Sequence, residues 1–412
     1  MASEWRDTTL GEVIRLQRGH DLPDSSRRPG NVPILGSFGI TGEHDEPRTK
    51  GPGVTVGRSG ASIGVVAFSA VDFWPLNTCL YVTDFQGNDP KFCFYWLKTL
   101  NLASFDSGSA QPSLNRNYIY HLPVRIPGVQ EQSEIAKLLD GLDESIRLKA
   151  ETKKTLETVA RTIFKSWFVD FDPVRAKAEG REPEGMDAAT AALFPSTFAE
   201  SQLGALPEGW AAMPLYEIAN FSNGAAYRDI HFSPRTEGLP VIKIAELKAG
   251  VTESTKFTET DLGERYRIEQ DEVLFSWSGN PDTSIDTFIW DGGPAWLNQH
   301  IFRVRENGMA PRASIYIQLK TLRPKFAEIA RDKQTTGLGH VTIADLKRLM
   351  VCKPTTEVTL RFDEIVSPIL EKVASNQLTC RVLASIRDSL LPRLISGKLR
   401  MPDAEKLVEA VL

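Results

Sequence analysis

Two long stretches of the chain carry apolar residues at alternating spacings of three and four positions. In residues 131–167 these are Ile135, Leu139, Leu142, Ile146, Leu156, Ala160, Ile163 and Trp167. In residues 355–400 they are Phe362, Val366, Ile369, Val373, Leu383, Leu390 and Leu394. This spacing is typical of a coiled-coil seam. A helix of about 37 residues is roughly 55 Å long, more than one small domain buries, so we expect the two helices to pack on each other, antiparallel.

Polar residues interrupt each seam near its middle. Lys149 and Lys153 do so in the first stretch, and Asn376 and Cys380 do so in the second. If the antiparallel helices are centred on each other, Lys153 lies near Asn376. Polar groups at such positions often fix the register of a helix pair. The alternative is that the lysines extend into solvent from a loosely packed middle.

The rest of the chain is rich in short β-branched runs between Gly, Pro and Asn residues. Residues 54–56, 65–68, 79–82 and 124–126 are such runs, and residues 91–102 have the apolar pattern of a helix. This mixture predicts a compact α/β (α+β) domain. A second segment, 206–354, has the same character.

The two globular segments are imperfect copies of one another. Trp5, Leu10, Glu12 and Gly19 recur as Trp210, Leu215, Glu217 and Gly224, and Leu97-Lys-Thr-Leu100 recurs as Leu319-Lys-Thr-Leu322. A repeat of this length predicts two similar sites or a pseudo-twofold body. The predicted parts are a first domain (1–128), a first helix (129–170), an ordered linker with short helices (171–205), a second domain (206–354), a second helix (355–400) and a tail (401–412).

Composition excludes several classes of protein. The 412 residues carry a formal net charge of -5, and most of the acidic excess lies in 129–205. We find neither an apolar run of about 18 residues nor a secretory signal, so we expect a cytoplasmic protein outside the membrane. The four cysteines are far apart in sequence, which predicts reduced thiols, and a catalytic thiol among them stays an alternative.

Motifs that carry catalysis are missing from the sequence. It has no phosphate-binding loop with Gly-Lys-Ser/Thr, no dinucleotide-binding glycine spacing, no Gly-x-Ser-x-Gly turn and no metal-ligand spacing of His with Cys or Glu. Asn280-Pro-Asp282 lacks the second proline and the aromatic residue of a base methyltransferase motif. We therefore expect a binding or scaffolding protein with no catalytic residues, no metal and no cofactor of its own.

Two loops in each globular segment have the residue types that contact DNA. One loop holds Arg58-Ser59 in the first segment and Trp277-Ser278-Gly-Asn280 in the second; the other lies just before each long helix. Small residues let a backbone approach a ligand, and Arg, Gln, Asn, Ser and Thr bond to base edges and phosphates. The alternative is ordinary turn chemistry at strand ends. The candidate DNA-binding residues are Arg58, Ser59, Gln111, Asn115, Arg116, Asn117, Lys243, Trp277, Ser278, Asn280, Thr336 and His340.

The whole chain resembles the specificity subunit of type I restriction-modification systems. The run from Ile163-Phe-Lys-Ser-Trp-Phe to Gly180, Leu206-Pro-Glu-Gly-Trp210 and the tail Leu391-Pro-Arg-Leu-Ile-Ser-Gly-Lys-Leu399 carry the resemblance. It implies two target recognition domains, each reading one half of a bipartite site in double-stranded DNA, and two helices that set the gap between the halves. It also implies docking of two modification subunits, which bind S-adenosylmethionine, and of restriction subunits, which use ATP.

Two other classes of protein compete with this interpretation. A stand-alone DNA methyltransferase lacks support because the cofactor and catalytic motifs are missing. A coiled-coil scaffold without DNA recognition explains the helices but not two strand-rich segments with polar, glycine-rich loops. Because Arg58-Ser-Gly differs from Trp277-Ser-Gly, the two half-sites are expected to differ.

Overall fold

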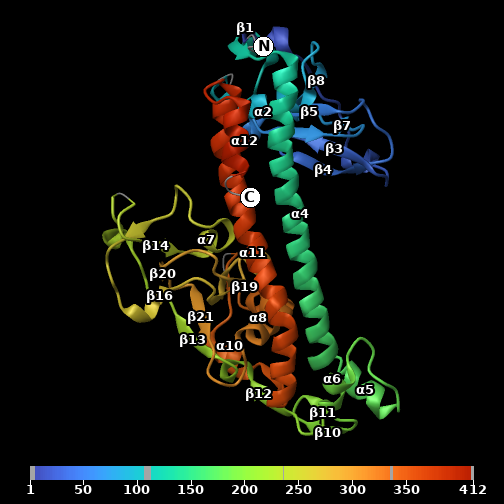
Figure 1. The fold of residues 1–412 in the computed structure, drawn as a ribbon, viewed down its shortest axis with the longest axis vertical. Coiled ribbons are helices and arrows are strands. Elements are labelled where there is room, and N and C mark those ends of the chain that lie inside the picture. Colours follow the sequence, from blue (N-terminus) through green and yellow to red (C-terminus); the bar gives the residue numbers. More distant parts are fainter. Residues whose placement is uncertain (1–4, 106–112, 235, 335–336, 410–412) are drawn as a thin grey trace. The chain divides into compact units, whose positions relative to one another are not determined.

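The computed structural model describes residues 5–105, 113–234, 236–334 and 337–409. The chain packs as two compact units, one made of 1–148 with 380–412 and the other of 149–379. Each unit holds one mixed α/β domain and one half of each long helix (Figure 1). Within the described ranges, no helix combines the length and the apolar character needed to cross a membrane.

Both predicted long helices are present. Helix α4 spans Val129–Phe168 and helix α11 spans Thr356–Ile395, each 40 residues long. Their seams are buried: Leu139, Phe362 and Val366 have no exposed surface. The antiparallel direction is visible within each unit. In the first unit Asp143 pairs with Arg387 and Ile146 contacts Cys380, so the numbers rise on one helix as they fall on the other.

The middle of the helix pair has a polar contact, in the second unit. Lys153 Nζ donates to Gln377 Oε1 at 2.5 Å. The predicted partner was the neighbouring Asn376, which instead is 3% exposed on the seam itself. A residue on the seam faces the apolar ridge of the other helix, whereas a residue beside the seam meets a long side chain that runs along its edge. The register is therefore the predicted one to within one residue, with Gln377 as the partner.

The domain of the first unit has an antiparallel four-stranded sheet with the order β2-β8-β5-β6 and a smaller sheet with the order β4-β3-β7, in which β3 and β7 are parallel. Strand β1 pairs with β9, which leads into α4. The strands are β1 Arg6–Thr9, β2 Arg15–Arg18, β3 Val32–Gly36, β4 Gly39–His44, β5 Gly53–Gly57, β6 Val66–Ser69, β7 Trp74–Pro75, β8 Cys79–Asp84 and β9 Pro123–Ile126; the helices are α1 Leu10–Val13, α2 Pro90–Thr99, α3 Arg116–Ile119 and α12 Met401–Glu409.

The domain of the second unit repeats the main sheet strand for strand, and its smaller sheet has one strand more. Its main sheet has the order β13-β21-β17-β19, its smaller sheet the order β15-β14-β20-β16 with β14 and β20 parallel, and β12 pairs with β23 before α11. The strands are β12 Ala211–Pro214, β13 Asn220–Asn223, β14 Leu239–Ile242, β15 Phe257–Thr258, β16 Arg267–Ile268, β17 Val273–Ser276, β18 Ser278–Gly279, β19 Asp286–Ile289, β20 Ala295–Leu297, β21 Ile301–Arg305, β22 Gly339–His340 and β23 Met350–Lys353; the helices are α7 Ile244–Ala249, α8 Arg312–Thr321, α9 Arg323–Asp332 and α10 Ile343–Arg348.

The residues shared by the two copies explain why the frames agree. The backbone N–H of Leu10 donates to the Leu122 carbonyl at 3.0 Å, and that of Leu215 donates to the Leu349 carbonyl at 2.8 Å. A Cβ on Gly19 would lie 2.1 Å from the Leu76 carbonyl oxygen, and one on Gly224 would lie 2.2 Å from that of Asn298. Only glycine permits such a close backbone approach.

One helix of each domain, α2 in the first and α8 in the second, makes a hydrogen bond to α4. Helix α2 begins at an Asp89 cap, whose side chain accepts the Phe92 N–H at 2.8 Å, and it ends three residues before the predicted end of 102. Tyr95 on α2 donates to Asp143 at 2.7 Å, and Tyr316 on α8 donates to Glu157 at 3.2 Å. The repeated helix is thus held to the first half of α4 in one unit and to its second half in the other.

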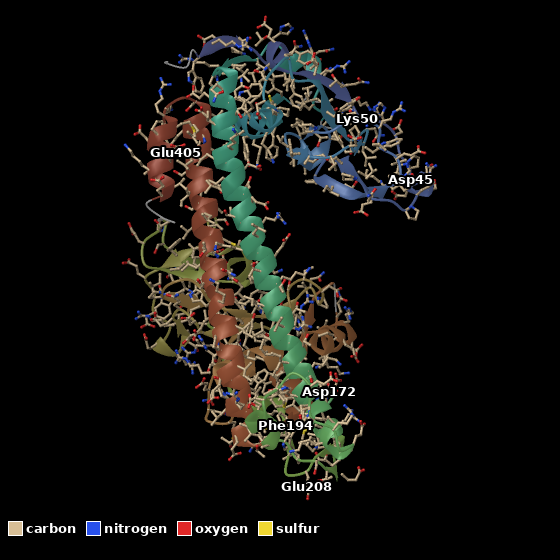
Figure 2. The ribbon with its side chains drawn as sticks, turned by 45° about the vertical axis from the view of Figure 1, so that its right-hand side comes forward. Asp45, Lys50, Asp172, Phe194, Glu208 and Glu405 are labelled. Atoms are coloured by element: carbon tan, nitrogen blue, oxygen red, sulfur yellow. The ribbon has the colours of Figure 1, made fainter. Side chains whose placement is uncertain are left out.

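The segment after α4 forms short helices and a hairpin. It contains α5 (Asp172–Ala178), α6 (Ala188–Ala192) and the hairpin of β10 (Phe198–Ser201) and β11 (Gly204–Pro207). Phe194 is 2% exposed and packs edge-on against Trp167, with ring centroids 5.0 Å apart. Figure 2 labels Asp172 and Phe194 in this segment and Glu208 directly after it. It also labels Asp45 and Lys50, which lie between β4 and β5 of the first domain.

The packing divides the chain at different places from the predicted domain boundaries. The unit boundaries fall inside the helices, at 148/149 and 379/380. The helices therefore do not form a separate body: each half shares a core with one domain, as Leu139 does with Trp96 in the first unit and Phe362 does with Leu319 in the second. The six segments expected from the sequence, with their boundaries, therefore stay a prediction.

Candidate nucleic-acid interface

In the first domain the two candidate loops lie side by side. Strand β5 ends at Gly57, and the backbone N–H of Arg58 then donates to the Thr78 carbonyl at 3.1 Å. The N–H of Leu114 donates to the Arg58 carbonyl at 2.8 Å, and Ser59 forms an antiparallel bridge with Ser113. Segments that are more than fifty residues apart in sequence thus make one surface.

The second domain brings its own two loops together in the same way. The N–H of Trp277 donates to the His300 carbonyl at 3.3 Å, and the N–H of Val341 donates to the Trp277 carbonyl at 2.9 Å. Strand β18 pairs with β22, with Ser278 opposite His340. Trp277, Ser278 and His340 were separate candidates in the sequence, and they are neighbours in the structure.

Arg58 holds a positive charge at the edge of the first surface. It is half-buried, and its Nη2 donates to Ser113 Oγ at 3.1 Å. Burial, and after it the charge of nearby Arg18, lower the pKa of the Arg58 guanidinium, which still remains protonated at neutral pH. Two positive charges that act on each other favour an anionic ligand such as a phosphate or the acceptor edge of guanine, and Asp21, 4.0 Å from Arg18, offsets part of them. Ser59 beside Arg58 is exposed.

The candidates on α3 have local structural roles. The Asn115 side chain accepts the N–H of Asn117 at 3.0 Å and so caps the helix, and Arg116 Nη1 donates to the Leu16 carbonyl at 3.0 Å. The side chain of Asn117 is exposed. Asn115 is exposed as well, but its side chain caps the helix. Gln111 lies outside the described residues.

Trp277 is at the centre of the second surface. Its Nε1 donates to Asn223 Oδ1 at 3.0 Å, and its ring lies 5.6 Å from the His300 ring and 5.9 Å from the His340 ring. Ser278 Oγ lies 2.9 Å from His340 Nδ1. Burial, and next the charge of His340, lower the pKa of His300, so this imidazole is neutral at pH 7. The surface combines an aromatic ring with neutral donors and acceptors.

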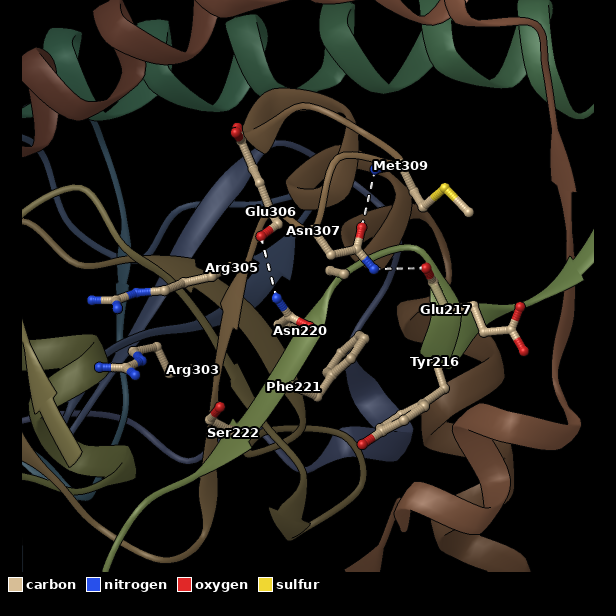
Figure 3. A pocket seen from close by; sticks show the side chains of 11 residues that line it. Tyr216, Glu217, Asn220, Phe221, Ser222, Arg303, Arg305, Glu306, Asn307 and Met309 are labelled. Carbon is tan, nitrogen blue, oxygen red and sulfur yellow. Dashed lines mark hydrogen bonds between the residues drawn. The ribbon is translucent and has the colours of Figure 1, made fainter. Parts of the chain in front are cut away.

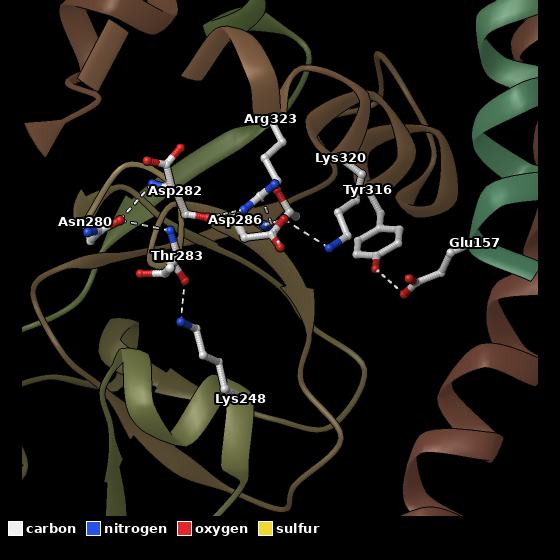
Figure 4. Close-up of polar contacts among 10 residues, drawn as sticks. Glu157, Lys248, Asn280, Asp282, Thr283, Asp286, Tyr316, Lys320 and Arg323 are labelled. Atoms are coloured by element: carbon white, nitrogen blue, oxygen red, sulfur yellow. Dashed lines mark hydrogen bonds and ion pairs between the residues drawn. The ribbon is translucent and has the colours of Figure 1, made fainter. Parts of the chain in front are cut away.

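The loop after β18 is tied down by hydrogen bonds and ion pairs (Figure 4). Asn280 Oδ1 accepts the backbone N–H groups of Asp282 and Thr283 at 2.9 and 3.1 Å. Lys320, from the repeated Leu-Lys-Thr-Leu, pairs with Asp286 at 3.0 Å. Asn280 is exposed, but its side-chain oxygen serves the turn, so only its amide NH₂ group points to a ligand role.

Lys243 precedes α7, close to this loop. Its side chain is exposed, with Nζ 5.0 Å from the centre of the Phe232 ring, and its backbone N–H donates to Glu246 at 3.0 Å. Lys248 at the other end of α7 donates to the Thr283 carbonyl, which holds the helix against the loop. Lys243 therefore places an exposed cation next to the loop after β18. Thr336 lies outside the described residues.

The sequence-based search missed four residues next to the candidates. In the first domain the charge of Arg18 acts on Arg58, and the Asn77 carbonyl lies 3.4 Å from Arg58 Nη1. In the second domain the side chains of Asn223 and His300 contact Trp277. One signal was present for two of them: Arg18 and Asn223 stand directly before the repeated glycines Gly19 and Gly224. The other two lie in turns whose contacts depend on strand register, which the sequence does not reveal.

A hollow of about 730 Å³ lies along β13 and β21, beside the second surface (Figure 3). Its two arginines already have partners, since Arg303 Nη1 donates to the Arg267 carbonyl at 2.6 Å and Arg305 pairs with Glu272. Because Glu272 neutralises Arg305 and Arg303 is only 8% exposed, the hollow is a weak place for an anion. We do not include it in the candidate interface.

The cysteines do not have the character of nucleophiles. Burial raises the pKa of both Cys79 and Cys352 to about 12, so neither is a thiolate at neutral pH. Burial also raises the pKa of Cys93. A catalytic thiol at these three positions is therefore not supported.

Comparisons with known proteins agree with this arrangement. The family model "Type I restriction modification DNA specificity domain" matches residues 2–158 and 207–386. The type I restriction enzyme MjaIX specificity subunit of Methanocaldococcus jannaschii is 25% identical over 323 residues, which cover 76% of this chain and 70% of that protein. The HindI specificity subunit of Haemophilus influenzae is 25% identical over 330 residues, which cover 70% of this chain and 71% of that protein.

A solved structure supports the fold. The crystal structure of a type I restriction-modification S subunit from M. genitalium superposes with a TM-score of 0.62 at 17% identity, over 95% of this chain and 96% of that one. The family model matches each of the two domains together with part of the long helix that follows it, and it covers most of the chain. The chain therefore belongs to the type I restriction-modification DNA specificity family.

Proposed function

We propose that this chain reads an asymmetric, bipartite site in double-stranded DNA, with one half-site for each domain. In this proposal the chain is not itself catalytic. S-adenosylmethionine is bound by modification subunits, two of which dock on it, and ATP is used by restriction subunits of the same complex. The specificity subunits that it resembles are named as parts of type I restriction enzymes.

One observation carries the proposal: the two domains present different side chains on the same backbone frame. Arg58 and Trp277 occupy the same place after a central strand, and each is held by the same pair of backbone hydrogen bonds. Conserving the frame keeps the position of the backbone against the DNA, whereas changing the side chains changes which base edges are recognised. Two such surfaces in one chain fit a site with two unlike halves.

The long helices support the roles of spacing and docking. At about 1.5 Å per residue, 40 residues make a helix of roughly 60 Å, longer than one turn of DNA. Large apolar side chains are exposed on the helices: Val159, Leu360 and Leu378 in the second unit are 43, 52 and 44% exposed. Exposed apolar side chains on a packed helix pair suit docking of a partner protein.

The proposal is tested with the chain in its complex with a modification subunit. Single-molecule methylome sequencing of cells that express both should give one bipartite motif with unlike halves. A hybrid whose residues 206–354 come from a relative should change one half of that motif and keep the other. Absence of a bipartite motif with the unaltered chain, or a change of both halves in the hybrid, would contradict the proposal. The matched control exchanges residues 1–128 and should change the opposite half.

A further inference from the structure

The backbone hydrogen bonds define which residues of the two domains occupy equivalent places. The N–H of Gly19 donates to the Cys79 carbonyl and that of Gly224 to the Ile301 carbonyl, both at 3.1 Å. The bonds from Arg58 to Thr78 and from Trp277 to His300 are likewise a pair. The equivalent positions that follow are Arg18 and Asn223, Arg58 and Trp277, Ser59 and Ser278, Asn77 and Gln299, Thr78 and His300, and Ser113 and His340.

These positions come from four segments that meet in each domain. In the first domain they are the end of β2, the residues after β5, the turn before β8 and the residues before α3. In the second they are the end of β13, the residues around β18, the turn before β21 and β22. The candidate loops of the sequence supply only two of the four segments. The strand end and the turn are additional.

The side chains of the additional segments are placed to contact a ligand together with the known candidates. In the first domain Arg58 Nη1 lies 3.4 Å from the Asn77 carbonyl, and the Asn77 side chain donates to Asp21, which also faces Arg18 at 4.0 Å. In the second domain Gln299 Nε2 lies 3.3 Å from His300 Nε2, next to the Trp277 ring. Arg18, Asn223, Gln299 and His300 are all exposed.

The chemistry of these side chains differs between the domains in a defined way. The first surface has two guanidinium groups: that of Arg18 is exposed and matches the paired acceptors of guanine, whereas both terminal nitrogens of Arg58 donate within the domain and its charge adds to that of Arg18. The second surface has the amide of Gln299, which matches the donor and acceptor of adenine, and the NH₂ group of Asn223, whose oxygen accepts from Trp277. The imidazole of His300 serves as donor or acceptor. An indole between them adds a flat apolar face for a thymine methyl group or a sugar.

We infer that Arg18 with Arg58 determines the half-site of the first domain, and that Gln299 and His300 with Asn223 determine the half-site of the second. The inference rests on the proposed function. It goes further because it assigns base recognition to the ends of β2 and β13 and to the turns before β8 and β21. A guanine-containing half-site is expected for the first domain, and an adenine-containing half-site for the second.

The test uses the assembled complex, with Gln299→Ala and His300→Ala in the second domain and Arg18→Ala in the first. Matched controls are Gln270→Ala and Arg6→Ala, exposed residues of the same types outside the two surfaces. Methylome sequencing should show that each variant of the second domain relaxes one or more positions in that domain's half-site only. Arg18→Ala should relax only the other half-site. Loss of a bidentate contact should lower discrimination at its base by about ten-fold or more.

A second variant distinguishes a change in base preference from a loss of folding. Gln299→Glu keeps the size of the side chain but turns its donor into an acceptor, so it should disfavour adenine, whose N7 needs a donor, and favour cytosine, whose N4 amino group donates. Size-exclusion chromatography should show all variants assembled as the unaltered complex is. The inference is overturned if the unaltered chain gives a bipartite motif and Gln299→Ala, Gln299→Glu and His300→Ala all leave it unchanged. If the unaltered chain gives no motif, the proposed function itself fails.

Discussion

At the scale of single residues, the same side-chain type serves either the ligand or the fold, depending on what lies within its reach. Arg58 and Arg116 were equal candidates in the sequence. Arg116 donates to the Leu16 carbonyl, 100 residues earlier in the chain, and so fastens α3 to β2. Arg58 donates to Ser113 Oγ and to the Asn77 carbonyl, both within the candidate surface, and the charge of Arg18 acts on it. The structure therefore separates two residues that the sequence treated alike.

Replacing these two arginines should give different defects. Arg58→Ala should weaken DNA binding by the assembled complex. It should also lower the steepness of log affinity against log salt concentration by about 1, because one positive charge within reach of a DNA phosphate is lost. Arg116→Ala should lower the free energy of unfolding by about 1 kcal/mol through its lost hydrogen bond. Fluorescence anisotropy over a salt series and denaturant titration measure the two effects. Equal salt slopes for Arg58→Ala and the unaltered chain would remove Arg58 from the interface.

Asp345 is a second residue whose importance only the structure reveals. It is 6% exposed, caps α10 through the Thr342 N–H at 2.8 Å, and binds Lys333 at 2.6 Å and Arg348 at 2.8 Å. Burial opposes the ionisation of Asp345, but the hydrogen bonds from Lys333 and Thr342 outweigh it and hold its pKa at about 2. The carboxylate thus fixes the segment that follows His340.

Asp345→Asn should destabilise the protein by about 1–2 kcal/mol at pH 7, a range that allows for solvent screening of the exposed cations. The folded-state pKa lies below the ordinary value of 3.8, so the carboxylate stabilises the fold fully above pH 4 to 5 and progressively less as the pH falls toward 2. Denaturant titrations of both proteins between pH 7 and pH 3 should therefore converge. A constant difference across that range would contradict this origin, and Asp332→Asn, at an exposed position, is the control.

At the scale of elements, the long helices combine a sequence-determined seam with a contact that depends on the tertiary structure. Seam residues such as Leu139 and Val366 are fully buried, as the heptad spacing predicted. Asn376 is also buried on the seam, and its side-chain NH₂ group lacks a hydrogen-bond partner in the described structure. A buried polar group of this kind costs stability and often restricts a helix pair to one register.

Cysteines at positions 153 and 377 should report this register. With the four native cysteines replaced by serine, Lys153→Cys with Gln377→Cys should be joined by a short bismaleimide crosslinker, because the ends of the native side chains are in direct contact and the crosslinker spans the length that two cysteines lack. Lys153→Cys with Lys372→Cys, more than one helical turn away, should not. Adding Asn376→Leu should keep or raise stability and spread the crosslinks over several partners. Preferred crosslinking of 153 with 372 would show that the helices have another register.

At the scale of the whole molecule, the two domains repeat the backbone arrangement of the main sheet but differ in the side chains of their candidate surfaces. The sheet orders β2-β8-β5-β6 and β13-β21-β17-β19 correspond strand for strand. Each long helix contributes one half to each compact unit, so both domains depend on both helices. A change in helix length is therefore a change to a part that the two units share.

Removing one heptad from each helix should shorten the gap between half-sites and leave the half-sites unchanged. Deleting 147–153 together with 377–383 removes both partners of the central polar contact and keeps the seam in phase. Seven residues of helix correspond to about 10 Å, or roughly 3 base pairs. Methylome sequencing gives the new gap. An unchanged gap would contradict a spacer role, and deletion of 147–153 alone, which mismatches the two helices, is expected to impair assembly.

The sequence by itself determined the parts that depend on local periodicity: two long helices with their seams, strand-rich domains built as a repeat, an ordered linker and the resemblance to a DNA-specificity subunit. An apolar spacing of 3.5 or 2 residues involves only residues that are close in sequence, so it can be recognised without knowing the tertiary structure. Only the tertiary structure decided that the two candidate loops of each domain meet and that Arg116 donates to the Leu16 carbonyl. It also decided that Gln377 rather than Asn376 contacts Lys153, and that Gln299 and His300 lie beside Trp277. Those outcomes follow from sheet register and from backbone hydrogen bonds between segments far apart in the chain, which no local pattern records.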